Sequence, residues 1–292
     1  MITTLPSYEF GVWTAFIFTG ISLLLGVLQC LKKYPRHGEG TPMVWGKQPV
    51  ALMAVSAGQL LMVYIIRSNM AGFFALTNMY ESLLAVALGM QFVTVFFFTV
   101  QKRYWQHPIL LVIAQTLALA YIYGAMQLNS SLEPLQPSLV SYWRAIHVPI
   151  IMLSYSLLFL AAIGAGLYLW QLKTAPKTEE GTLSEASQTA LAVYDDWTFS
   201  CVQWAFPLLT IGIALGAVWA NEAWGTYWNW DPKEAMALAT LLIFGGYWHL
   251  RLHEKGSKEG LQWVVILGLA ILLITYFGIN LMGVGLHSYG RF

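Results

Sequence analysis

Four tryptophans crowd into one short stretch of the chain. They are Trp219, Trp224, Trp228 and Trp230, with Tyr227 among them, whereas the whole sequence holds 13 Trp in 292 residues. Tryptophan prefers the membrane–water interface, so one interpretation is an aromatic belt. A belt spreads its aromatic residues over many helix ends, however, and this cluster also contains polar residues. Flat aromatic faces with a few polar groups favour a site for a large, planar, partly apolar ligand.

The end of this stretch carries the signals of a helix start. Asp231 suits the N-cap position, Pro232 the first helical position, and Glu234 the third, where its side chain completes a capping box. The sequence therefore predicts a loop over residues 219–234 that ends on a capped helix. The dipole of that helix favours an anionic group nearby. We expect this helix end, with Asp231 and Glu234, to help hold the acidic groups of the ligand.

Two histidines lie on either side of the Trp cluster in the sequence, His147 and His287. A single histidine at a membrane interface is more often a polar anchor, but two neutral imidazoles can ligate the iron of one haem from its two faces. His249 follows Asp231 by 18 residues, which is about 27 Å along a helix. It cannot share a haem with that pair. We place it in the inner leaflet, where it is a separate functional candidate unless its side chain reaches the cytoplasm. His253, His37 and His107 are interpreted as solvated.

The composition places the chain in a membrane. Hydrophobic residues make up 58%, charged residues 10%, and the mean hydropathy is +0.60, whereas a soluble domain has about a quarter charged residues. The net charge of +1 gives no reason to expect a nucleic-acid partner. Cys30 and Cys201 form no CxxC motif, so neither a thioredoxin-like dithiol nor a site for covalent haem attachment is expected.

Eight apolar runs are long enough to span a bilayer. They cover residues 10–31, 50–66, 82–100, 108–126, 148–170, 201–220, 235–250 and 261–279. The connections 32–49, 101–107, 171–200 and 251–260 hold eleven of the 15 Lys and Arg residues, so the positive-inside rule places them in the cytoplasm and both termini outside. The sequence thus predicts an all-α, polytopic bundle that forms a single domain over residues 1–292. Residues 171–200 are expected to form a flexible cytoplasmic linker.

Glu81 begins the third run, on the same side as the Trp cluster. Its carboxylate can pair with Arg67 or Arg144, or it can serve the binding site. The sequence leaves these alternatives open.

The segment Trp219-Ala-Asn-Glu-Ala-Trp-Gly-Thr-Tyr-Trp-Asn-Trp-Asp-Pro-Lys-Glu234 resembles the WWD signature of haem-handling membrane proteins. Within that superfamily, the chain is most similar to the CcsA (ResC) family of System II cytochrome c biogenesis. Further matching segments are Thr77-Asn-Met-Tyr-Glu-Ser82, His147-Val-Pro-Ile-Ile-Met-Leu-Ser-Tyr155, Phe206-Pro-Leu-Leu-Thr-Ile-Gly212 and Asn280-Leu-Met-Gly-Val-Gly-Leu-His-Ser-Tyr-Gly290. The resemblance runs from about Thr77 onward.

The resemblance implies haem b as cofactor, with His147 and His287 as axial ligands beside the WWD loop and His249 as the transmembrane haem ligand. It implies the haem-ligating subunit of a cytochrome c synthase (haem lyase), which presents haem to the CxxCH motif of apocytochrome c. The implied partners are a CcsB/ResB-type membrane subunit and a thiol-reducing, thioredoxin-like protein. The implied location is a bacterial plasma membrane or a thylakoid membrane, in contact with its lipids.

Two other functions are compatible with parts of the sequence. One is a membrane regulator of tetrapyrrole synthesis similar to HemX, but the complete histidine pair favours the synthase. The other is an unrelated transporter with an aromatic belt. Few ionisable residues lie within the apolar runs, which makes an ion path a poor interpretation.

Overall fold

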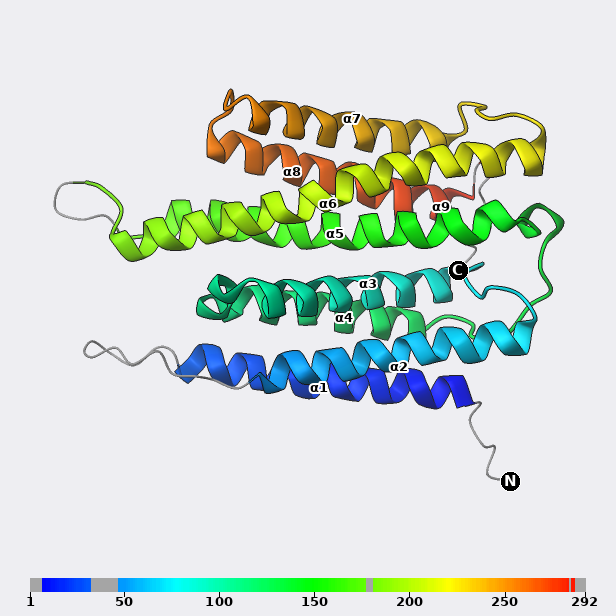
Figure 1. Ribbon diagram of the computed structural model, residues 1–292, viewed down its shortest axis with the longest axis horizontal. Helices are drawn as coiled ribbons and strands as arrows, with labels where there is room; N and C mark the ends of the chain where they lie inside the picture. The colour runs from blue at the N-terminus through cyan, green and yellow to red at the C-terminus, as the bar shows by residue number, and fades with distance from the viewer. Residues whose placement is uncertain (1–6, 33–46, 177–180, 284, 287–292) are drawn as a thin grey trace. The chain divides into compact units, whose positions relative to one another are not determined.

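The computed structural model describes residues 7–32, 47–176, 181–283 and 285–286. These residues are mostly helical (Figure 1). The long helices are α1 (Ser7–Lys32), α2 (Gln48–Ala71), α3 (Met79–Val100), α4 (Pro108–Met126), α5 (Tyr142–Thr174), α6 (Glu185–Trp224), α7 (Pro232–Leu252) and α8 (Lys258–Leu273). Shorter elements are the 3₁₀ helices η1 (Lys102–Gln106) and η2 (Pro137–Leu139), the π-helical turn η3 (Ile274–Gly278) and the last short helix, α9 (Ile279–Met282).

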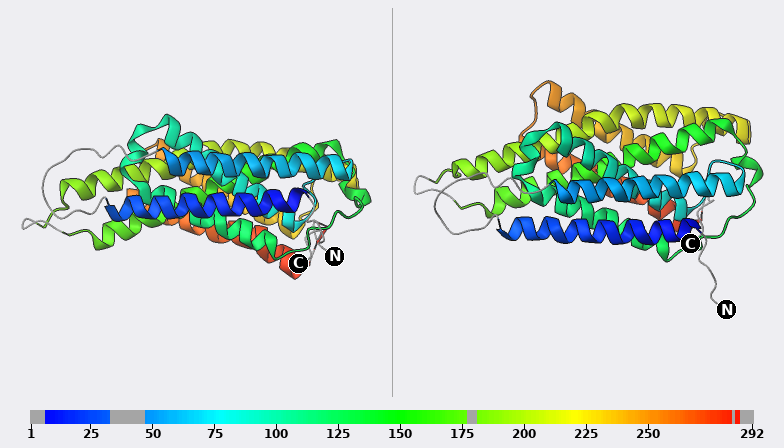
Figure 2. Two further views of the ribbon diagram at one scale, coloured as in Figure 1. Left: turned by 90° about the horizontal axis from the view of Figure 1, so that it is seen from below. Right: turned by 60° about the horizontal axis from the view of Figure 1, so that its bottom comes forward.

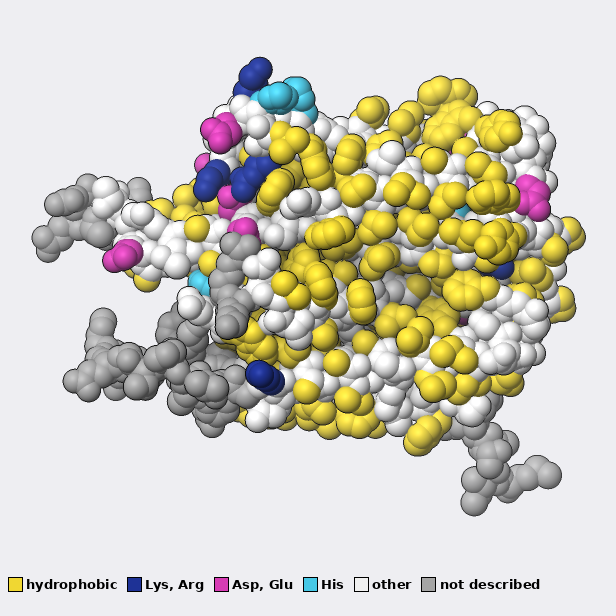
Figure 3. All heavy atoms as spheres, viewed as in Figure 1, with side chains coloured by type: hydrophobic (Ala, Val, Ile, Leu, Met, Phe, Trp, Pro, Cys, Tyr) yellow, Lys and Arg dark blue, Asp and Glu magenta, His cyan; other side chains and the backbone are white. Residues whose placement is uncertain are grey.

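Eight helical segments in the described part of the chain are long and apolar enough to cross a membrane, the last running from Lys258 to Met282 through η3 and α9. Each of the eight predicted runs lies within one of them, so the all-α, eight-span prediction is confirmed. Helices satisfy their own backbone hydrogen bonds, which a hydrocarbon environment requires. Hydrophobic side chains cover much of the surface that Figure 3 presents. The protein is a multi-pass integral membrane protein.

Helix α6 is much longer than the predicted span, with 40 residues. It begins at Glu185, so the predicted flexible linker 171–200 is corrected: only residues 175–184 separate α5 from α6. Ser184 caps α6, because its side chain accepts a hydrogen bond from the backbone of Ser187. The polar residues near the start of α6 led to the linker prediction, but this part of the helix has an apolar face. On that face, Trp197 is fully buried, and its indole N–H donates to the carbonyl of Leu160 at 2.8 Å.

The described chain divides into two compact units, residues 1–75 with 86–132, and residues 76–85 with 133–292. The division falls within α3. In the first unit, α1 packs against α2 and α4. Its buried polar side chains bond to one another: the Gln91 amide donates to Thr19 at 2.8 Å and to Ser56 at 3.1 Å. Such interhelical bonds stabilise helix pairs in lipid. The single domain over residues 1–292 stays a prediction.

In the second unit, α5 lies along α6 and also packs against α8, while α7 packs against α8 and α6. Figure 1 shows α5 and α6 running along each other, and Figure 2 gives two further views of these helices. A small residue permits this close approach: a Cβ atom added to Gly164 of α5 would lie 2.5 Å from Oγ1 of Thr198 in α6. Small residues at interfaces let helices pack tightly in membranes.

A charged cluster joins α6, α7 and α8 where α7 ends. The carboxylate of Asp195 accepts two hydrogen bonds of 2.9 Å from Arg251 and one of 2.9 Å from the Gln262 amide. Nζ of Lys258 lies 3.5 Å from the same carboxylate. Because Asp195 is 3% exposed, removing its charge takes away the carboxylate that pairs with the partly buried Arg251 guanidinium.

We therefore expect Asp195→Asn to lower the thermal stability of the detergent-solubilised protein. Breaking a buried ion pair costs about 3 kcal/mol, which a melting curve detects. Glu185→Gln is the matched control, because it removes one negative charge from an exposed position of the same helix. Equal melting temperatures for Asp195→Asn and the control would contradict the structural role of this cluster.

Candidate functional site

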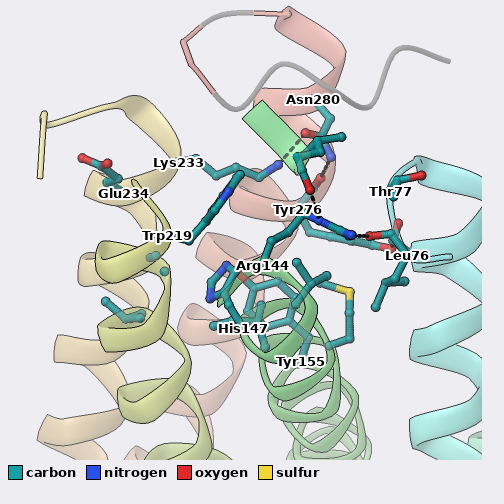
Figure 4. A pocket seen from close by; sticks show the side chains of 18 of the residues that line it. Leu76, Thr77, Arg144, His147, Tyr155, Trp219, Lys233, Glu234, Tyr276 and Asn280 are labelled. Carbon is teal, nitrogen blue, oxygen red and sulfur yellow. Dashed lines mark hydrogen bonds between the residues drawn. The ribbon is translucent and has the colours of Figure 1, made fainter. Parts of the chain in front are cut away.

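A pocket opens in the second unit where α5 begins, α6 ends, α7 begins and η3 meets α9. Its walls are mainly apolar and aromatic, and its volume is about 190 Å³. Figure 4 shows His147 near Trp219, with Lys233 extending across the pocket toward Asn280. The residues that carry polar or aromatic groups into the lining are Thr77, Asn78, Ser82, Arg144, His147, Tyr155, Trp219, Tyr227, Trp228, Lys233, Glu234, Tyr276 and Asn280.

His147 lies in the second turn of α5, which begins after the N-cap Ser141. Its ring atom Nδ1 lies 2.7 Å from the carbonyl oxygen of Gly212 in α6. A carbonyl oxygen only accepts hydrogen bonds, so Nδ1 carries the proton and donates. In a neutral imidazole, the lone pair then lies on Nε2. This is the tautomer that a metal-ligating histidine needs when its other nitrogen bonds a carbonyl.

A glycine makes room for this ring. A Cβ atom added to Gly216 of α6 would lie 2.7 Å from Cε1 and 3.0 Å from Nδ1 of His147. Real Cβ contacts do not approach the first of these distances, so any other residue at position 216 would displace the imidazole. Gly212 and Gly216 lie one helical turn apart, and together they supply the hydrogen-bond acceptor and the space.

The ring of Trp219 also packs against the His147 ring. The two rings stack with centroids 5.9 Å apart and an interplanar angle of 24°. Trp219 is 3% exposed, and its indole nitrogen donates to the carbonyl of Ser138 at 3.0 Å. The ring of Trp224 lies 5.1 Å from that of Trp219. Trp219 therefore helps fix the orientation of His147 as well as lining the pocket.

The predicted loop 219–234 is shorter in the structure. Trp219 and Trp224 belong to α6, because no helix-breaking residue follows Val218 until Gly225. Gly225 has φ = 80°, in the left-handed region, and its N–H bonds to the carbonyl of Asn221 at 2.9 Å. A glycine adopts this conformation at a helix end without a steric penalty. The nonhelical segment is residues 225–231.

The other aromatic residues of the cluster lie in this short segment. Tyr227 and Trp228 line the pocket, and Tyr227 is 60% exposed. Trp230 lies outside the lining, is 70% exposed, and meets the ring of Trp228 edge-on at 5.8 Å. It has φ = 56°, which is unusual for a bulky residue and costs about 1–3 kcal/mol. The carboxylate of Glu234 holds this conformation, because Oε2 accepts from the N–H groups on both sides of Trp230, at 2.8 and 3.2 Å.

The predicted capping box of α7 is confirmed. Asp231 is the N-cap, accepts from the Lys233 N–H at 3.0 Å, and forms the reciprocal pair with Glu234. A second oxygen of Asp231 accepts from the N–H of Leu286, which ties the end of the described chain to the start of α7. Asp231 is buried and is not part of the pocket lining. The carboxylates of Asp231 and Glu234 therefore both accept hydrogen bonds from backbone N–H groups.

Two basic residues of the lining, Lys233 and Arg144, were not predicted as site residues from the sequence. Nζ of Lys233 lies 2.7 Å from Oδ1 of Asn280, whose amide nitrogen donates to the carbonyl of Tyr276 at 2.7 Å. Arg144 donates to the carbonyls of Leu139 and Leu76, at 2.7 and 3.0 Å. The position of Lys233 in the first turn of a helix was the available signal, because a cation there opposes the helix dipole.

Glu81 organises the edge of the pocket. Its carboxylate accepts from the backbone and hydroxyl of Thr77, at 2.7 and 3.1 Å. Thr77 follows Leu76, whose carbonyl binds Arg144. Glu81 thus holds the short segment that contacts Arg144. Whether Glu81 pairs with Arg67 or with Arg144 stays open.

His249 does not join His147 in this pocket. His249 lies near the C-terminal end of α7, whereas the pocket lies at its N-terminal end, as the rise of about 27 Å over 18 helical residues requires. His287 lies outside the described residues, so its pairing with His147 stays a prediction. Among the residues that the structure describes, no three His, Cys, Asp or Glu side chains form a cluster able to hold a metal ion. A porphyrin would supply the four equatorial iron ligands itself.

Comparison with known proteins identifies the family. A family model described as "Cytochrome C assembly protein" matches residues 76–287, close to the range expected from the sequence. "Cytochrome c biogenesis protein CcsA" of Guillardia theta is 37% identical over an alignment of 234 positions, and the match covers 75% of this chain and 78% of that protein. The protein of the same name from Synechococcus sp. (strain RCC307) is 34% identical over an alignment of 281 positions, and that match covers 87% of this chain and 88% of the relative. The chain therefore belongs to the cytochrome c assembly protein family.

Proposed function

We propose that this protein acts in cytochrome c biogenesis by binding haem b at the pocket and presenting it to apocytochrome c. The observation that carries this proposal is the Nδ1–H···O bond from His147 to Gly212 at 2.7 Å. It orients an imidazole whose Nε2 lone pair is suited to bind iron. Family membership supports the same function, because the curated relatives are named as cytochrome c biogenesis proteins.

His287 is proposed as the second axial ligand. Its neighbour Leu286 is bound through its N–H to Asp231, directly beside the start of α7. This anchor holds Leu286, the residue before His287 in the sequence, at the start of α7. We assign Asp231 the role of fixing both the start of α7 and the segment that leads to His287, in place of direct contact with the ligand's acidic groups.

The aromatic lining suits the porphyrin. Trp219, Tyr227 and Trp228 offer flat faces, and such rings pack well against a planar macrocycle. The cavity of about 190 Å³ is smaller than sites of roughly 300–1,000 Å³ that enclose a ligand of this class. We infer that one part of the haem enters the pocket while the rest lies against the exposed rings, where its vinyl groups remain accessible to a protein substrate.

The charges of the lining suit the propionates. Three of its residues are formally charged, namely Arg144, Lys233 and Glu234. The Lys233 ammonium has three donors, of which Asn280 takes one. Arg144 already bonds two carbonyls. Lys233 is therefore the residue proposed to bind a propionate directly, and Arg144 contributes mainly positive potential.

The reaction itself belongs to the haem vinyl groups and the CxxCH thiols of the substrate. This chain's residues hold the haem, keep its ring edge accessible and exclude water from its buried edge. No catalytic residue is assigned, and the protein is proposed as the haem-ligating subunit of a haem lyase. A CcsB/ResB-type membrane subunit, apocytochrome c and a thiol-reducing, thioredoxin-like protein are the proposed partners.

The distribution of basic residues supports an orientation with both termini and the pocket outside the cytoplasm. His249, at the opposite end of α7, is then the proposed haem ligand toward the cytoplasmic side. Haem would pass from there to the pocket, in a bacterial plasma membrane or a thylakoid membrane.

The central test is the absorption spectrum of the protein purified with its membrane partner. We expect a b-type haem spectrum that is lost in the His147→Ala, His287→Ala double variant, because both axial ligands are removed. His107→Ala is the control and is expected to retain the spectrum. Absence of haem from the parent complex, or an unchanged spectrum in the double variant, would refute the proposal.

Gly216→Ala tests the positioning of His147 without changing a ligand. The added methyl group displaces the ring, and overpacking of this kind costs about 1–3 kcal/mol. We expect haem to be bound about tenfold more weakly, as measured by transfer to apomyoglobin. Gly246→Ala is the matched control, because no atom lies within 4 Å of a Cβ atom added there. If both variants release haem at the parental rate, Gly216 does not position the ligand.

Lys233→Gln tests the propionate contact. Removal of the ammonium is expected to weaken haem binding about tenfold. Binding of haem dimethyl ester, which lacks the two carboxylate charges, is expected to be the same in the variant and the parent. Lys255→Gln is the control at the other end of α7. If Lys233→Gln weakened the binding of haem and of haem dimethyl ester equally, the substitution would disturb the pocket as a whole and the charge contact would be refuted.

A further inference from the structure

Two histidines lie one helical turn apart at the C-terminal end of α7. The ring centroids of His249 and His253 are 4.5 Å apart, with an interplanar angle of 60°. The backbone N–H of His253 bonds to the carbonyl of His249 at 3.2 Å, so the helical register continues through both residues. Both side chains are exposed, and Figure 3 shows exposed histidine side chains at this end of α7.

This spacing is one at which a helix chelates a metal ion. Residues i and i+4 lie on the same helical face, and paired histidines at this separation bind zinc in known helical motifs. Zinc–nitrogen bonds are about 2.0–2.1 Å long, so two nitrogens on a tetrahedral ion lie about 3.3 Å apart. Side-chain rotation can bring nitrogens of two rings that are already in contact to this separation. Imidazole suits Zn²⁺, Ni²⁺ and Cu²⁺.

The surrounding charges permit a cation here. Arg251 lies between the two histidines in sequence, but its guanidinium forms a bidentate pair with Asp195 on α6. Lys258, at the start of α8, also contacts that carboxylate. The C-terminal end of a helix carries partial negative charge, which favours a cation. The Asp195 cluster also fixes this end of α7 against its neighbours, so the two imidazoles project from a rigid support.

We propose that His249 and His253 form a bidentate site for a divalent transition-metal ion, separate from the pocket at the other end of α7. Within the described residues, no third His, Cys, Asp or Glu completes a cluster, so water supplies the remaining ligands. The proposal concerns free metal ions and does not depend on haem binding. If His249 also ligates haem, an ion held by the pair competes with haem for that imidazole.

The test is Zn²⁺ titration of the full chain by isothermal titration calorimetry, with haem absent and with a purification tag that contains no histidine. We expect a binding event that weakens at least tenfold in His249→Ala and in His253→Ala. The double variant His253→Ala, Glu254→His keeps the number of histidines but moves the second imidazole off the shared face, so it is not expected to restore binding. His147→Ala is the control at the pocket and is expected to bind Zn²⁺ like the parent.

Melting curves establish that each variant is folded. Parental affinity in folded His253→Ala, or recovery of affinity in the displaced double variant, would overturn the proposed chelate. Absence of a haem spectrum from the parent complex, with Zn²⁺ binding to the His249–His253 pair retained, would refute only the haem proposal.

Discussion

The hydrogen bond from His147 to the carbonyl of Gly212 links the packing of two membrane helices to the orientation of the imidazole that is proposed to bind iron. It requires α5 and α6 to lie close together, which glycines on both helices permit. Gly164 admits Thr198 at one position, and Gly216 admits the imidazole at another. If α6 shifted relative to α5, the ring would lose its acceptor and its tautomer would no longer be fixed.

Most polar groups of the site lie at the ends of helices. Within a bilayer, a polar group without a partner is costly, and the lining places most of its polar groups where helices begin or end. The Asp231 and Glu234 carboxylates satisfy backbone N–H groups at the start of α7. Near the other wall, the π-helical turn η3 precedes Asn280, which bonds both Lys233 and the Tyr276 carbonyl. Such turns are frequent at functional sites.

Much of this structure could be predicted from local patterns in the sequence. The eight apolar runs and the Asp231-Pro232-Lys233-Glu234 cap depend on neighbouring residues, and both are confirmed. The length of α6 was missed because Ser, Thr and Glu near its start resemble a linker by composition, although Trp197 and its neighbours bury an apolar face. Trp219 and Trp224 were assigned to a loop because aromatic density does not distinguish a helix end from an irregular segment.

Contacts between residues that are distant in the sequence could not be predicted from it. Nothing local indicates that Gly212 accepts from His147, 65 residues away, or that Asn280 binds Lys233, 47 residues away. These contacts orient the imidazole of His147 and bond the ammonium of Lys233 to Asn280. A third distant contact, from the N–H of Leu286 to Asp231, is the basis on which Asp231 is proposed to anchor two segments.

Imidazole rescue of His147→Gly tests whether His147 ligates the haem iron, because it restores the ligand without the side chain. The measurement is the electron paramagnetic resonance spectrum of the oxidised, haem-loaded complex. We expect the low-spin signal of the parent to be lost in His147→Gly and to return on addition of free imidazole. A parental low-spin signal in His147→Gly before imidazole is added would contradict it.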